Sequence, residues 1–184
     1  MTNHSKPNRS ELDNFEKQVF NALSRLGDQS TQELDFASRH NTHIKFSKQK
    51  KSGAKWTVLK NISLNADSYS IETDPGDLGL LSLVVHEIRH LQQGPLTALS
   101  VYGELDAWQV GFRFYRKVSS KPLRKPLEEL LELPLSWSRQ NLLQAKILMK
   151  QYSPGYRIDW YPLYPIHHEI IWWLTHHQPG GSET

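Results

Sequence analysis

Cysteine is absent from the 184 residues of this sequence. Its absence excludes disulfide bonds and thiolate metal ligands, so any zinc ion would have to be bound by nitrogen and oxygen atoms. It does not indicate a compartment, because cysteine-free proteins occur on both sides of a membrane.

Long apolar runs are absent as well. No stretch approaches the roughly 18 consecutive apolar residues that a membrane-spanning helix requires. The polar N-terminal stretch MTNHSKPNRSELDNFEK lacks the apolar region of a secretory signal. We therefore expect no membrane partner and a cytoplasmic location.

The net charge is small, at +3, and much of the basic excess lies in residues 45–55, KFSKQKKSGAK. Such a run can contact nucleic acid or an acidic surface, but it is more often a solvated hairpin loop. We expect the solvated hairpin loop, and we do not expect a nucleic-acid partner.

The most informative stretch is residues 78–93, LGLLSLVVHEIRHLQQ. Its apolar first half predicts a helix that is buried in the middle of a domain. Positions i and i+4 lie on one face of a helix, so His86 and His90 can direct ring nitrogens at one zinc ion, and Glu87 can reach a metal-bound water. This is the H-E-x-x-H pattern. A solvent-facing helix turn is the alternative, and the apolar residues before the motif argue against it.

A catalytic zinc site needs a third protein ligand, for which we predict Glu104 in a second helix over residues 96–118. Glu104, Ala107 and Gly111 share one stripe of that helix, and the two small residues allow a close approach to a neighbouring helix. Asp106 is an alternative third ligand. It lies about 200° from Glu104 around a helix, so both carboxylates cannot face one metal.

HEIRH followed by a helix that contains GELDA resembles the gluzincin class of zinc metallopeptidases. Their pattern is H-E-x-x-H with a later E-x-x-A or E-x-x-S, and the resemblance covers roughly a fifth of the chain. It implies that His86, His90 and Glu104 are zinc ligands and that Glu87 is the general base.

The resemblance departs from the fuller pattern at Trp108, where an Asp often follows the Ala or Ser. In some members that Asp supports a ligand histidine, and Asp106 is the candidate to replace it here. The metzincin pattern does not fit, because it requires Gly and His where this chain has Gln93 and Leu96.

The resemblance implies a peptidase that acts on a protein or peptide. Glu87 would take a proton as water attacks a carbonyl and pass it to the leaving amine, while one further donor stabilises the oxyanion. Candidate donors or supporting groups late in the chain are Tyr156, Tyr161, Tyr164 and His167. Two alternatives stay open: a zincin-fold binding or regulatory protein with a structural or vestigial metal site, and a nucleic-acid-binding protein with an incidental motif.

The order of expected elements predicts an α+β fold, a mostly helical zincin-like domain with a small twisted sheet packed on the HExxH helix. The edge strand of that sheet is expected beside the site. Residues 1–9 and 178–184 are expected to be disordered tails around a single domain over residues 10–177. This domain divides into helices and sheet (10–73), metal-site helices (77–118) and a helical, aromatic part (119–177). The aromatic residues of its C-terminal segment, RIDWYPLYPIHHEIIWWLTHH, are expected to wrap the core or cover one wall of the cleft.

Strands are predicted over residues 43–48, 56–64 and 68–72, the second as one strand or two short ones. Helices are predicted over residues 11–26, 31–38, 78–93, 96–118, 127–133, 137–151 and 166–176. Expected N-caps are Ser10 for the first of these helices, Asp74 or Asp77 for the metal helix, and Ser136 for the helix over 137–151.

Overall fold

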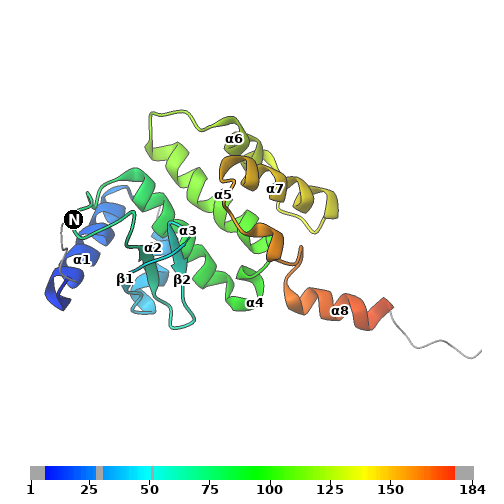
Figure 1. The fold of residues 1–184 in the computed structure, drawn as a ribbon, viewed down its shortest axis with the longest axis horizontal. Helices are drawn as coiled ribbons and strands as arrows, with labels where there is room; N and C mark the ends of the chain where they lie inside the picture. Colours follow the sequence, from blue (N-terminus) through cyan, green and yellow to red (C-terminus); the bar gives the residue numbers. More distant parts are fainter. Residues whose placement is uncertain (1–6, 28–30, 51, 177–184) are drawn as a thin grey trace, which may run out of the picture.

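The computed structural model describes residues 7–27, 31–50 and 52–176. Within them the chain is mostly helical and contains one three-stranded sheet, which confirms the predicted α+β class. In Figure 1 the sheet and the first two helices lie on one side of a central helix pair, and the later helices lie on the other side. No described helix is long and apolar enough to cross a bilayer.

The first helix, α1 (Arg9–Arg25), begins earlier than predicted, and α2 (Thr31–Arg39) follows it. Asn8, not Ser10, is the N-cap: its side chain accepts a hydrogen bond from the Glu11 amide at 3.0 Å. The Glu11 carboxylate in turn accepts from the Asn8 amide at 2.8 Å. This reciprocal capping box orders the chain from Asn8, so the prediction of a disordered tail over residues 1–9 was wrong at its C-terminal end.

The sheet contains β1 (Ile44–Ser47), β2 (Ala54–Trp56) and β3 (Ile62–Asn65) in the order β1-β3-β2. β1 is parallel to β3, and β2 is antiparallel to it. Residues 45–55 therefore do not form the predicted hairpin. Strand β3, whose four residues are all buried, takes the central position and separates β1 from β2.

The strand predicted over residues 68–72 was also wrong, because this segment forms turns. The Ser70 amide donates to the Thr73 hydroxyl, and the Glu72 amide donates to the Ser70 hydroxyl. Such local bonds from Ser and Thr side chains compete with strand pairing.

The central helix α3 (Leu78–Gln93) has the predicted bounds. Asp77 caps it by accepting a hydrogen bond from the Leu80 amide at 2.8 Å, and Gly94 ends it with a φ of 74°. Its apolar positions are buried in one core with α1 and the sheet.

The helix predicted over residues 96–118 is two helices, α4 (Pro95–Ala98) and α5 (Val101–Val118). Ser100 separates them, because its hydroxyl accepts from the Gly103 amide at 3.0 Å and donates to the Thr97 carbonyl. A Cβ atom on Gly103 would lie 2.1 Å from that same carbonyl oxygen, so the corner requires glycine.

A second core joins α5 to α6 (Lys125–Glu132), α7 (Arg139–Tyr152) and the 3-10 turn η2 (Ile158–Trp160). Ser138 rather than the predicted Ser136 caps α7, since its hydroxyl accepts from the Asn141 amide. The last helix, α8 (Ile166–His176), extends away from both cores in Figure 1.

Candidate metal centre

Three side chains from α3 and α5 converge where these helices cross. The Nε2 atoms of His86 and His90 are 3.1 Å apart. Glu104 Oε2 lies 3.4 Å from the His90 nitrogen and 3.9 Å from the His86 nitrogen. The structure thus brings together the three ligands that the sequence predicted, and all three are buried or nearly so.

The close approach of α5 to α3 depends on Gly111. A Cβ atom there would lie 3.0 Å from the Ser82 carbonyl oxygen and 3.1 Å from the His86 Cβ. The Ser82 hydroxyl donates to the Gly111 carbonyl at 2.8 Å and joins the helices at the same point. The predicted small-residue stripe therefore places Glu104 within reach of the histidines.

A polar relay orients His90. Its Nδ1 lies 3.1 Å from Gln93 Oε1, so the ring donates its proton to the amide oxygen and presents Nε2 to the centre. The Gln93 amide nitrogen donates to Asp106 Oδ2 at 2.7 Å and to the Gly103 carbonyl at 2.9 Å. Arg89 holds the same Asp106 oxygen at 2.7 Å.

Asp106 is therefore not placed as a ligand but supports one indirectly. The role of Asp106 as a supporting group agrees with the prediction from the sequence, whereas the intervening Gln93 was not predicted. The available signal was the i+3 spacing of Gln93 from His90, which puts both side chains on one helix face.

His86 is oriented by α5 in a different way. The ring forms a hydrogen bond with the Ala107 backbone and packs edge-on against Trp108, with ring centroids 6.3 Å apart. Trp108 stands where the gluzincin pattern often has an Asp, so the histidine here packs against an aromatic ring instead of a carboxylate.

The three ligands carry linked charges in the absence of a metal. Burial, together with the neighbouring His90, lowers the pKa of His86 to about 3. Burial alone would also lower the pKa of His90, but the Glu104 carboxylate raises it to about 9. Burial alone would raise the pKa of Glu104, but the two histidines lower this pKa below its usual value. His90 is thus the protonated member at neutral pH, paired with an ionised Glu104.

Glu87 points away from this cluster, toward the sheet. Its Oε2 atom is buried and has no hydrogen-bond partner among the described residues. Burial raises its pKa to about 7, while His90 and a hydrogen bond from the Trp56 backbone oppose that rise. Burying an oxygen without a hydrogen-bond partner costs free energy. Such an unpaired group is typical of a side chain that binds a ligand or takes part in a reaction.

Tyr156 is the one predicted late donor that contacts a ligand. Its hydroxyl donates to Glu104 Oε2 at 2.5 Å, and burial together with that carboxylate raises its pKa well above the usual value. Tyr161 lines a neighbouring pocket. Tyr164 packs against Trp137 and His168, and neither it nor the exposed His167 lines the cleft beside the ligands.

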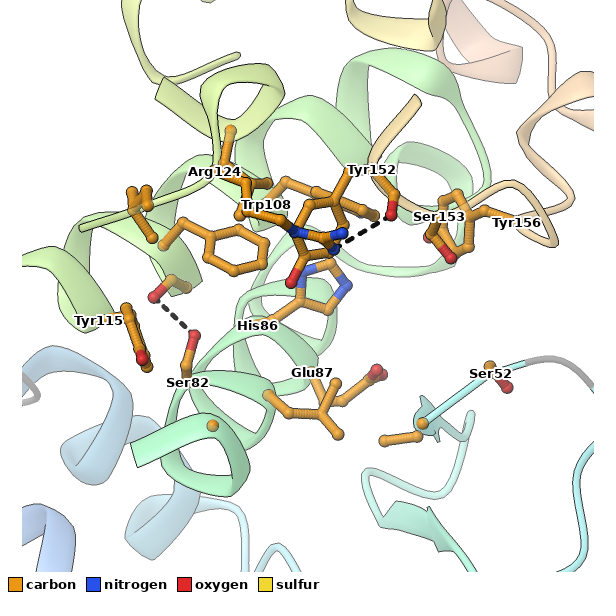
Figure 2. A pocket seen from close by; sticks show the side chains of 18 of the residues that line it. Ser52, Ser82, His86, Glu87, Trp108, Tyr115, Arg124, Tyr152, Ser153 and Tyr156 are labelled. Carbon is orange, nitrogen blue, oxygen red and sulfur yellow. Dashed lines mark hydrogen bonds between the residues drawn. The ribbon is translucent and has the colours of Figure 1, made fainter. Parts of the chain in front are cut away.

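A cleft of about 520 Å³ opens beside the ligands. Figure 2 shows His86 and Glu87 projecting into it from α3, with Trp108, Tyr152 and Tyr156 around it and Ser52 across from Glu87. Edge strand β2 contributes Ala54 to the lining.

The ligand distances can be compared with those of a real metal centre. Ligand atoms about 2.0–2.2 Å from a tetrahedral zinc ion lie about 3.3–3.5 Å from one another. The observed separations of 3.1, 3.4 and 3.9 Å match this within a few tenths of an ångström. Two imidazoles and one carboxylate are also a ligand set that zinc accepts in catalytic sites. The residues present therefore fit a metal ion.

No protein-family model, curated protein or solved structure matches this chain. Its function therefore has to be inferred from the geometry of the site.

Proposed function

We propose that this protein is a zinc-dependent metallopeptidase. One observation carries the proposal: three metal-ligand atoms converge beside an open cleft into which a buried carboxylate projects, and one oxygen of that carboxylate has no partner. His86, His90 and Glu104 would hold the ion. Bound zinc supplies Lewis-acid activation of a water molecule and of the substrate carbonyl.

Glu87 has the properties of a general base. Its pKa of about 7 allows it to accept a proton from the attacking water and to return it to the leaving nitrogen. The two imidazoles and Glu104 would bind the ion. Glu87 is not needed as a ligand and can therefore carry out the proton transfer.

Tyr156 is our candidate for the oxyanion donor. Its raised pKa keeps the hydroxyl protonated, and the hydroxyl already lies against Glu104 at the edge of the cleft. The hydroxyl has a single proton, so it would turn from Glu104 to donate a hydrogen bond to a carbonyl oxygen as negative charge develops on that oxygen.

Strand β2 is suited to hold an extended peptide. The Gly53 carbonyl accepts from the Asn65 amide of β3, and the Thr57 amide donates to the carbonyl of Asn61, the residue before β3. In an antiparallel ladder the backbone groups of the alternate residues, Ala54 and Trp56, then face away from β3. The Trp56 amide already donates to Glu87, which leaves the Ala54 groups and the Trp56 carbonyl for a further strand. An extended substrate can add to this edge as another strand. This arrangement favours a peptide over a small molecule as the substrate.

The substitution Glu87→Gln tests the proposal. We expect at least about a hundred-fold loss of peptide hydrolysis with the zinc content unchanged, because the base is removed and the ligands are kept. The matched control is Glu169→Gln, which makes the same change in the His-Glu pair of α8 and should leave activity unaltered. A wild-type protein that binds zinc but cleaves no peptide in a broad library would contradict the proposal and favour a metal-binding protein without catalysis.

A further inference from the structure

A second hollow adjoins the cleft. It has a volume of about 360 Å³ and shares Ser52 and Tyr156 with the lining of the cleft. Four exposed cationic side chains surround it, and no acidic residue lines it. We call it the basic pocket; the four cations are Lys48, Lys50, Lys55 and Arg157.

The cations of the basic pocket make no ion pair with a carboxylate in the described part of the chain. The nearest acid in sequence, Asp159, is already paired with Lys150 at 2.5 Å and Lys146 at 3.5 Å. Four like charges around one hollow repel one another, so an anionic ligand there would relieve that repulsion.

The cations of the basic pocket lie in or near strand β2, which is proposed to hold the extended peptide. Lys55 belongs to edge strand β2, and Lys48 and Lys50 lie in the segment that leads into it. Arg157 follows directly after Tyr156, which contacts the metal ligand Glu104. A peptide extended along β2 from the cleft would therefore pass the basic pocket.

We propose that the basic pocket binds an acidic segment of the peptide substrate next to the bond that is cleaved. This inference rests on the proposed peptidase function and adds the substrate class. Inside the cleft itself, the cation Arg124 stacks on the Tyr152 ring at 3.9 Å and continues the positive lining. A protein or peptide substrate with Asp and Glu beside the cleaved bond is complementary to both surfaces.

An acidic peptide fits these observations better than a nucleic acid does. Nucleic-acid sites combine a long basic groove with exposed aromatic faces for base stacking. Here the cations surround one small hollow, and the Tyr156 hydroxyl is bonded to Glu104. The outer backbone edge of β2 is suited to pair with a peptide backbone rather than with bases.

The test compares two fluorescent peptides on the full-length chain by anisotropy, one rich in glutamate and one with every glutamate replaced by glutamine. We expect the glutamate peptide to bind roughly ten-fold more tightly at low salt, and the preference to fall as salt is raised toward about 0.5 M. This comparison needs no variant of the protein. Mass spectrometry of the same samples reports cleavage separately.

The double variant Lys50→Glu with Arg157→Glu should abolish the preference for glutamate. The matched control is Lys17→Glu with Arg25→Glu, which makes the same change in net charge on exposed positions of α1 and should keep the preference within about two-fold. Thermal melts of both variants show whether each is folded.

Three results would overturn the inference: equal binding of the two peptides, equal loss in both double variants, or stronger binding of single-stranded DNA than of the glutamate peptide. If both peptides are cleaved alongside any of these results, the proposed peptidase function still stands. A preference for glutamate without any cleavage by metal-loaded protein would support the basic pocket and contradict the peptidase.

Discussion

Helices α3 and α8 are both apolar and both carry a His-Glu pair, but their surroundings are opposite. In α3 the apolar side chains are in the core, with Ile88 at 0% exposure. In α8 they face solvent, with Ile170 at 53% and Leu174 at 60%. His168 of α8 stacks on Trp137 with ring centroids 4.4 Å apart, and among the described residues it belongs to no group of three possible metal ligands. A His-Glu pair becomes a candidate site only when a packed second helix supplies the remaining groups.

The largest difference between the two helices should appear in stability. Ile88→Ala removes a fully buried side chain between α3 and its neighbours, and we expect it to lower the free energy of unfolding by about 2–5 kcal/mol. Ile170→Ala is the same change on exposed α8 and should stay within about 0.5 kcal/mol. Urea denaturation measures both values. A loss at Ile170 as large as that at Ile88 would mean that α8 is packed against a partner in solution.

The next effect concerns the polar relay, which α8 lacks. Gln93→Ala removes the acceptor that orients His90 and leaves Asp106 with Arg89 alone. We expect zinc affinity to fall about ten- to a hundred-fold, or about 1.4–2.8 kcal/mol, with the fold intact. Competition with a chelating dye measures the affinity, and Gln144→Ala on the exposed face of α7 is the control. Unchanged affinity would show that the relay does not support the ligand.

The smallest expected effect is the release of protons when the metal binds. Below pH 9 the buried His90 is protonated in the metal-free protein, since its pKa is raised to about 9. Metal binding needs the neutral ring, so we expect the release of about one proton per ion at pH 7 and an apparent affinity that rises with pH up to about 9. Calorimetry in buffers with different ionisation enthalpies measures this release. A binding heat independent of the buffer would contradict the proposed His90–Glu104 pairing.

The features that the sequence predicted well are local. The bounds of α3 follow from its apolar run between Asp77 and Gly94. Helical spacing places His86 and His90 on one face, and the small residue Gly111 signals the approach of α5. These rules of spacing and capping require no knowledge of the tertiary fold.

The features that the sequence did not predict depend on distant contacts. The strand order β1-β3-β2 is set by which strand is buried, and residues 45–55 suggested a hairpin instead. The bond between Gln93 and Asp106 exists because α5 lies across α3. The aromatic segment was expected to wrap the core or cover the cleft. Tyr161 and Tyr164 of this segment do pack against the second core, whereas the described apolar side chains Ile170 and Leu174 of α8 are exposed.

The most direct test of the metal centre is the zinc content of the purified chain after incubation with zinc and dialysis. We predict about one ion per chain in the wild type and in His168→Ala, and a loss of the ion in His86→Ala and Glu104→Ala. The absence of zinc from the wild type, or its retention in Glu104→Ala, would contradict a centre built from His86, His90 and Glu104.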